Sequence, residues 1–240
     1  MFTLNKIGKN RMKILAIGAH PDDIEIFMYG ILSIFLKRND KISMIVATDG
    51  DAGNVTTNQN LSKIRKKETI EALKIFGTPV FLGYADGELS IQTNIISTLK
   101  KHIDSIEPDL IITHPPEDYH SDHRSLSHYV KSSAGFKYPL LFCETLMGVN
   151  FNPNVYIDIS EYFKDKAKAI LKHKSQNPVK FLNAVEINNK FRAAQCNAGG
   201  QSYAEVFRFE PTFPFVDLRY LLPSTMPIRP YYKNIPSSLI

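Results

Sequence analysis

Two short clusters of histidine and aspartate hold the side chains best suited to chemistry. Residues 19–25 read Ala-His-Pro-Asp-Asp-Ile-Glu, and residues 120–123 read His-Ser-Asp-His. His20 and Asp23 lie three residues apart across a tight turn, so an imidazole and a carboxylate can meet on one ion at about 2.0–2.2 Å. His123 would supply the third ligand.

A set of two histidines and one carboxylate leaves a coordination position open for water. Zinc in such a site lowers the pKa of that water to about 7, so hydroxide is available at neutral pH. This ligand set therefore favours hydrolysis. Ferrous iron and other divalent metals use the same ligands, so the pattern supports Zn²⁺ without excluding Fe²⁺.

Each cluster also has a purely structural interpretation. Asp22 and Asp23 could cap a helix that starts near Ile24, because carboxylates favour that end of a helix. The second cluster could be a polar surface loop in which Asp122 caps the next helix. The occurrence of both clusters after strands favours a shared site, because ligands bind outside the carboxyl ends of parallel strands.

Strand and helix patterns alternate through the first 130 residues and loosen beyond them. This alternation predicts an α/β fold, a Rossmann-like three-layer sandwich whose mostly parallel central sheet is covered on both faces. Ser160 is expected to cap one of the helices. Strands are expected at 13–18, 42–48, 80–82, 109–113, 138–144, 155–159 and 203–209, and helices at 24–37, 61–76, 91–106, 160–173 and 178–194.

The length and composition fit one sizeable core. With 240 residues, 43% of them hydrophobic, we expect a single domain over residues 1–240 with its core at 13–210. The tail at 211–240 is rich in proline and aromatic residues. It is expected to form an extended wrap or an oligomer contact, and it is compatible with a homo-oligomer.

The charge and the cysteine content limit the kinds of binding partner and metal site that we expect. The net charge is +5, but lysine and arginine are scattered, so no nucleic-acid partner is expected. Cys143 and Cys196 form no thiolate metal motif and no disulfide framework. Neither a secretory signal nor an apolar stretch long enough for a bilayer is evident, so we expect a cytoplasmic protein without a membrane partner.

The paired clusters resemble the LmbE and PIG-L family of zinc-dependent N-acetylglucosaminyl deacetylases. The resemblance implies a metal-dependent N-deacetylase, a hydrolase that breaks a linear amide C–N bond in an N-acetyl amino sugar or related conjugate. Weaker similarities are Thr48-Asp-Gly50, Arg65-x-x-Glu68, Leu82-Gly83 with Asp86-Gly87, His173-x-Ser-Gln176 and Ala204-Glu-Val-Phe207.

Carried over residue by residue, the resemblance implies that the three ligands above bind the metal and that Asp22 is the general base. His120 would stabilise charge on the carbonyl oxygen, most usefully if protonated, and Asp122 would orient a neighbouring histidine. Either Asp22 or His120 could protonate the leaving amine. Arg65 and Asp86 are similar in placement to substrate-binding residues of the family.

The substrate is expected to be a small amino sugar, either free or nucleotide-linked. Two other function classes fit part of the pattern. A metal-dependent phosphoesterase usually needs two metals about 3.5–4 Å apart, and a non-catalytic sugar- or nucleotide-binding protein would need none of the catalytic roles. No Gly-x-Gly-x-x-Gly motif follows the first strand, so no dinucleotide cofactor is expected. His114, at the end of the fourth strand, is expected to support the site rather than to bind the metal.

Overall fold

The computed structural model describes residues 11–53 and 60–231. Its central sheet is built from β1 (Lys13–Gly18), β2 (Lys41–Thr48), β3 (Val80–Tyr84), β4 (Leu110–Thr113), β5 (Leu140–Cys143), β6 (Val155–Asp158) and β7 (Ala204–Arg208). The strand order is β3-β2-β1-β4-β5-β7-β6. Strands β1 to β5 run parallel, and β7 pairs antiparallel with both β5 and β6. The expected mostly parallel α/β sandwich is confirmed.

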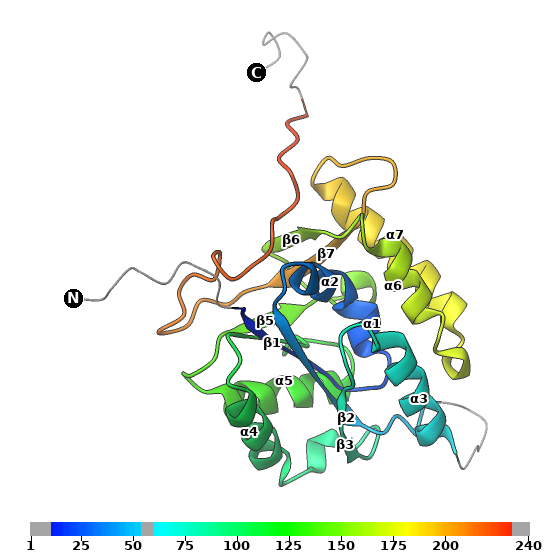
Figure 1. Cartoon of the computed structure of the whole chain (residues 1–240), viewed down its shortest axis with the longest axis vertical. Coiled ribbons are helices and arrows are strands. Elements are labelled where there is room, and N and C mark those ends of the chain that lie inside the picture. The colour runs from blue at the N-terminus through cyan, green and yellow to red at the C-terminus, as the bar shows by residue number, and fades with distance from the viewer. Residues whose placement is uncertain (1–10, 54–59, 232–240) are drawn as a thin grey trace.

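Helices cover both faces of the sheet (Figure 1). Side chains of β1 alternate between the faces: Leu15 and Ile17 pack with α4 and α5, while Ile14 and Ala16 pack with the other helices. The helices are α1 (Asp23–Phe27), α2 (Tyr29–Lys37), α3 (Leu61–Leu73), α4 (Ile95–Ile106), α5 (Ser121–Ala134), α6 (Phe163–Ile170) and α7 (Pro178–Gln195), with short 3-10 turns η1 (Leu89–Ile91), η2 (Leu146–Gly148) and η3 (Lys174–Gln176).

Strands β1 and β4 are neighbours, with Ile14 opposite Leu110 and Ala16 opposite Ile112. The chain moves outward from β1 to β2 and β3, then crosses back to place β4 on the other side of β1. The loops after β1 and β4 therefore diverge from one point at the carboxyl edge of the sheet, where α/β proteins bind ligands.

Two local predictions were wrong. The helix expected at 24–37 breaks at Met28 into α1 and α2, because the Glu205 carboxylate accepts hydrogen bonds from Gly30 N and Ile31 N, each at 2.8 Å, and so caps a new helix start. Ser160 does not cap α6, which begins only at Phe163. The Ser160 hydroxyl instead donates to Asp158 Oδ1 at 2.6 Å.

The described part of the C-terminal tail lies along the body. Leu218, Leu221 and Met226 are buried, and Met226 N donates to Tyr156 O on β6 at 2.9 Å. No helix within residues 11–53 and 60–231 is long and apolar enough to cross a membrane. The single-domain interpretation and the homo-oligomer stay predictions.

Candidate metal centre

The first cluster lies in the turn between β1 and α1. Asp22 has a φ of 134°, a backbone conformation that non-glycine residues rarely adopt and that tends to persist at functional sites. Thr48 supports the turn, because its N and Oγ1 donate to Ala19 O at 2.8 and 2.9 Å. Within the described chain the Asp22 side chain makes no capping hydrogen bond to α1. Its Oδ2 instead accepts a hydrogen bond from Arg65 Nη2 at 3.1 Å.

The second cluster begins α5. His120 is the residue that caps this helix, because its Nδ1 accepts the Asp122 N–H at 3.2 Å. The Asp122 carboxylate reaches away from its own helix and accepts hydrogen bonds from Gly87 N at 2.7 Å and Leu89 N at 3.2 Å. Capping by a carboxylate therefore does not explain the aspartates of either cluster.

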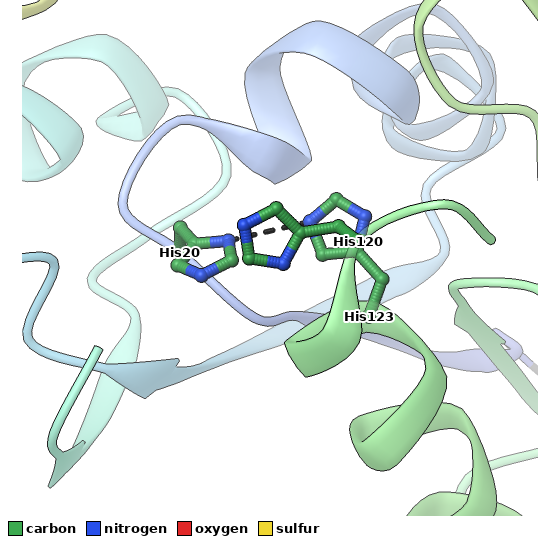
Figure 2. A group of neighbouring side chains, drawn as sticks. All are labelled: His20, His120 and His123. Carbon is green, nitrogen blue, oxygen red and sulfur yellow. Dashed lines mark hydrogen bonds between the residues drawn. The ribbon is translucent and has the colours of Figure 1, made fainter. Parts of the chain in front are cut away.

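The three proposed ligands converge. His20 Nδ1 lies 3.3 Å from His123 Nε2 and 3.4 Å from Asp23 Oδ2, and His123 Nε2 lies 3.4 Å from Asp23 Oδ1. Figure 2 shows His20 and His123 turned toward each other beside His120. Ligands about 2.1 Å from a tetrahedral ion are about 3.4 Å apart, so the donor spacing fits a divalent cation such as zinc.

Carboxylates on the outer side fix which nitrogen of each histidine faces this centre. His123 Nδ1 lies 3.1 Å from Asp118 Oδ2, while His20 Nε2 lies 3.1 Å from Asp86 Oδ1 and 3.3 Å from Asp122 Oδ2. Metal-binding histidines characteristically donate their second N–H to such a partner. His20 Nδ1 and His123 Nε2 are therefore left for the metal. Sequence reasoning missed Asp118, although it lies only two residues before the second cluster.

Three groups among the described residues bring potential ligand atoms close enough to share an ion. Two of them include members of the proposed set together with His114 or His120, and the third combines His20 with two carboxylates. They are His20, His120 and His123; Asp23, His114 and His123; and His20, Asp86 and Asp122.

His114 contacts two of the proposed ligands, Asp23 and His123. It is fully buried, its Nε2 lies 3.0 Å from Asp23 Oδ2, and its ring stacks on His123 with centroids 3.8 Å apart. Burial and the neighbouring His123 lower the pKa of His114 to about 4, so it is neutral. These contacts suit the expected supporting role and also make His114 the nearest alternative ligand.

We predict that the pair formed by His20 and His123 releases a proton when a metal ion binds. Burial alone would lower the pKa of His123, but Asp23 and Asp118 outweigh burial and raise this pKa to about 9. The facing nitrogens of His123 and His20 are 3.3 Å apart and can hold one proton between them, not two. That proton must leave before a cation binds, so metal affinity should fall about tenfold per unit as the pH drops below 9.

Calorimetric zinc titration of the metal-free protein at pH 7, in buffers of different protonation enthalpy, counts the protons released. We expect about one from the pair. Binding without any proton release would contradict the assignment.

The catalytic candidates have distinct electrostatic environments. Burial raises the pKa of Asp22 to about 6, although the Arg65 charge opposes the rise. Burial and the nearby His20 lower the pKa of His120. His120 is therefore neutral near pH 7, and because its Nδ1 accepts a hydrogen bond, its Nε2 carries the proton. A neutral His120 can still donate a hydrogen bond from this N–H, and its role at the carbonyl oxygen stays a prediction.

Arg65 is only 3% exposed. Its Nη1 donates to Gly50 O at 2.8 Å, and its Nη2 donates to Pro21 O at 2.8 Å as well as to Asp22. Asp86 Oδ2 lies 3.7 Å from Arg65 Nη1. The guanidinium thus holds the Asp22 turn in place, a role that the sequence did not reveal.

A cavity of about 460 Å³ opens above these side chains, a volume suited to a small molecule. Its walls are partly apolar and partly polar. His20, Asp22, Asp23, Arg65, Asp86, His120 and His123 line it together with Ile26, Phe27, Ala52, Gly53, Gly87, Tyr119, Ser121, Leu146, Gln176 and Phe181. Asp122 is fully buried behind this surface.

The fold and site together define a class, an α/β protein with a nitrogen- and oxygen-ligand centre at the switch point of its sheet. Residues 15–134 match the PIG-L family, GlcNAc-PI de-N-acetylase, and the chain belongs to this family. It is 32% identical to the uncharacterized deacetylase YaiS of Escherichia coli (strain K12), over 70% of this chain and 94% of that protein.

Solved structures agree on the fold. The N,N'-diacetylchitobiose deacetylase from Pyrococcus horikoshii superposes with a TM-score of 0.74 at 25% identity, covering 88% of each chain. GalB, the 4-carboxy-2-hydroxymuconate hydratase of Pseudomonas putida KT2440, has a TM-score of 0.72 at 17% identity, covering 82% of this chain and 95% of that one. The second likeness shows the fold alone, since one fold hosts several reactions.

Proposed function

We propose that the chain is a zinc-dependent hydrolase that removes the acetyl group from an N-acetyl amino sugar or a related sugar conjugate. The observation that carries this proposal is the convergence of His20, Asp23 and His123 within 3.4 Å, beside the Asp22 carboxylate. Membership of a de-N-acetylase family supports the reaction type. The donor set supports zinc and also accommodates ferrous iron.

A divalent cation held by these three residues would polarise the amide carbonyl and lower the pKa of a water molecule. Asp22 accepts the proton of the attacking water, and a carboxylate with a pKa near 6 suits this task close to neutral pH. Arg65 keeps the Asp22 carboxylate oriented into the cavity. The Asp122 carboxylate orients the His20 ring through a hydrogen bond with His20 Nε2.

His120 stabilises the charge that develops on the carbonyl oxygen by donating its Nε2–H. A neutral imidazole is a poor source of a proton for the leaving amine, because losing Nε2–H would leave an anion. Asp22, which holds a proton after the first transfer, is therefore the proposed donor to the amine.

The proposed substrate is a small N-acetyl amino sugar such as an N-acetylglucosaminide. The aromatic rings of Tyr119 and Phe181 and the side chain of Leu146 line the cavity and can pack against a sugar ring. Arg65 and Asp86 remain the proposed substrate contacts, with Arg65 acting largely through the turn that it holds. A nucleotide-linked sugar and a cytoplasmic location are further parts of this proposal, and two free cysteines are consistent with a reducing compartment.

A substrate panel tests the proposal. Zinc-loaded protein is incubated with N-acetylglucosamine, diacetylchitobiose and a nucleotide-linked N-acetylglucosamine, while released acetate and free amine are both quantified. We expect equal amounts of the two products from at least one sugar. Phosphate release from a phosphate ester with two ions bound per chain would favour the phosphoesterase, and tight sugar binding without any product would favour a non-catalytic binding protein.

A further inference from the structure

A buried pair joins two segments that are far apart in the chain. His173 Nε2 lies 2.8 Å from Glu25 Oε1 across 148 positions of sequence. Glu25 is 0% exposed and His173 is 2% exposed. Glu25 belongs to α1, two residues after the proposed ligand Asp23, and His173 directly precedes η3. The contact therefore links the metal side of the cavity to a segment from the second half of the chain.

A second contact fixes the same segment to α3. Ser175 donates to Glu68 through its N at 3.0 Å and through its Oγ at 2.6 Å. The next residue, Gln176, lines the cavity. Its Nε2 donates back to Ser175 O at 3.1 Å, whereas among residues 11–53 and 60–231 its Oε1 accepts no hydrogen bond. Residues 173–176 thus place the side chain of Gln176 in the lining of the cavity.

The pair has features that stability does not explain. Glu25 Oε2 and His173 Nδ1 are both buried without a hydrogen-bond partner in the described chain. Burying ionisable groups is costly, and apolar residues of similar volume are often neutral or better for stability. Unsatisfied buried groups of this kind need an explanation.

The buried Lys166 and Glu205 form an instructive contrast within the same protein. Their side chains also lie 2.8 Å apart. Glu205 has partners for both oxygens, from Lys166 and from the Gly30 and Ile31 N–H groups. This pair has a structural role, because the Glu205 carboxylate caps the first turn of α2. Within the described chain the Glu25–His173 pair starts no helix, and it joins α1 to the segment that carries the cavity residue Gln176.

We propose that Glu25 and His173 are positioning residues that form a strut between the metal side and the substrate side of the cavity. The strut keeps Gln176 at a fixed distance from Asp22 and Asp23, where its Oε1 accepts a hydrogen bond from a sugar hydroxyl. This inference rests on the proposed deacetylase function. Misplacement of a substrate by about 1 Å can cost about 100-fold in rate. Preventing such a misplacement gives a functional reason for burying this ionisable pair.

Three variants test the strut. Glu25→Leu with His173→Leu removes both partners and leaves no unpaired ion. Glu25→Gln is conservative, because its amide oxygen still accepts from His173 Nε2. Glu205→Gln with Lys166→Met is the matched control, since it neutralises an equally buried pair outside the cavity site. For each we measure kcat and KM on the best N-acetyl sugar, the melting temperature, zinc content, and hydrogen exchange of backbone amides 173–177.

For the double leucine variant we expect kcat/KM to fall roughly 10-fold to 100-fold, with unchanged zinc content and no loss of melting temperature. Exchange at 173–177 should accelerate. Glu25→Gln should stay within about threefold of the wild type in kcat/KM, since the hydrogen bond survives. The control should lower the melting temperature and leave kcat/KM and exchange at 173–177 unchanged.

Wild-type kcat/KM and wild-type exchange in the double leucine variant would overturn the strut. A loss of kcat/KM that follows melting temperature in all variants, the control included, would overturn it as well. If the wild type releases acetate from no N-acetyl sugar, the proposed function fails, and hydrogen exchange alone then decides: acceleration supports the strut and wild-type exchange rejects it.

Discussion

Asp22→Asn is expected to lower kcat for N-acetyl sugar hydrolysis by about 10²- to 10⁴-fold, the usual contribution of a general base. The asparagine carbonyl still accepts the Arg65 Nη2 hydrogen bond that Asp22 accepts at 3.1 Å, so the turn keeps its shape while the proton acceptor is lost. Zinc content should match the wild type. Initial rates of acetate release, with metal analysis of the same preparations, check both expectations.

Asp40→Asn is the matched control for this variant. Asp40 is 8% exposed, as Asp22 is, and it pairs with Arg38 Nε at 2.7 Å far from the two clusters in the fold. Replacing this buried aspartate should leave the rate unchanged. Deacetylation at the wild-type rate by Asp22→Asn would rule out Asp22 as the base.

His123→Ala is expected to abolish stoichiometric zinc binding and to lower activity by more than roughly 100-fold. Loss of a partner outside the ligand shell already costs about 10- to 100-fold in affinity or activity, and loss of a ligand costs more. The remaining His20 and Asp23 would form an incomplete set. Zinc content after dialysis and the rate of acetate release are the measurements.

His128→Ala is the control on the same helix, because His128 is exposed on α5. It should retain both zinc and activity. His114→Ala distinguishes the two candidates for the second nitrogen ligand, His123 and His114. If His123→Ala keeps one zinc per chain while His114→Ala loses it, the ligand set contains His114 in place of His123.

The meeting of the two clusters was predictable from sequence, because strand and helix alternation places the ends of β1 and β4 at one sheet edge. Hydropathy patterns also located most elements. The break at Met28 was not predictable, since it depends on Glu205 of β7, which accepts the Gly30 N–H across 175 positions of sequence. Periodicity reports which face of a segment is buried and carries no information on such long-range polar contacts.

The hydrogen-bond partners of the site histidines could not be predicted from the sequence for the same reason. Asp118 and His123 are close in sequence, but only the turn geometry shows that their side chains meet at 3.1 Å. The protonation state of His120 likewise depends on burial and on His20. Residue types therefore predicted which side chains meet at the candidate site, while the partners of each histidine became visible only in the folded chain.

The most direct test of metal-dependent deacetylation titrates metal-depleted protein with zinc while acetate release from the best N-acetyl sugar is followed. We predict a rate near zero without metal, a linear rise with added zinc, and a plateau at one equivalent per chain. Full activity without metal, or a plateau only at two equivalents, would contradict a single hydrolytic centre at His20, Asp23 and His123.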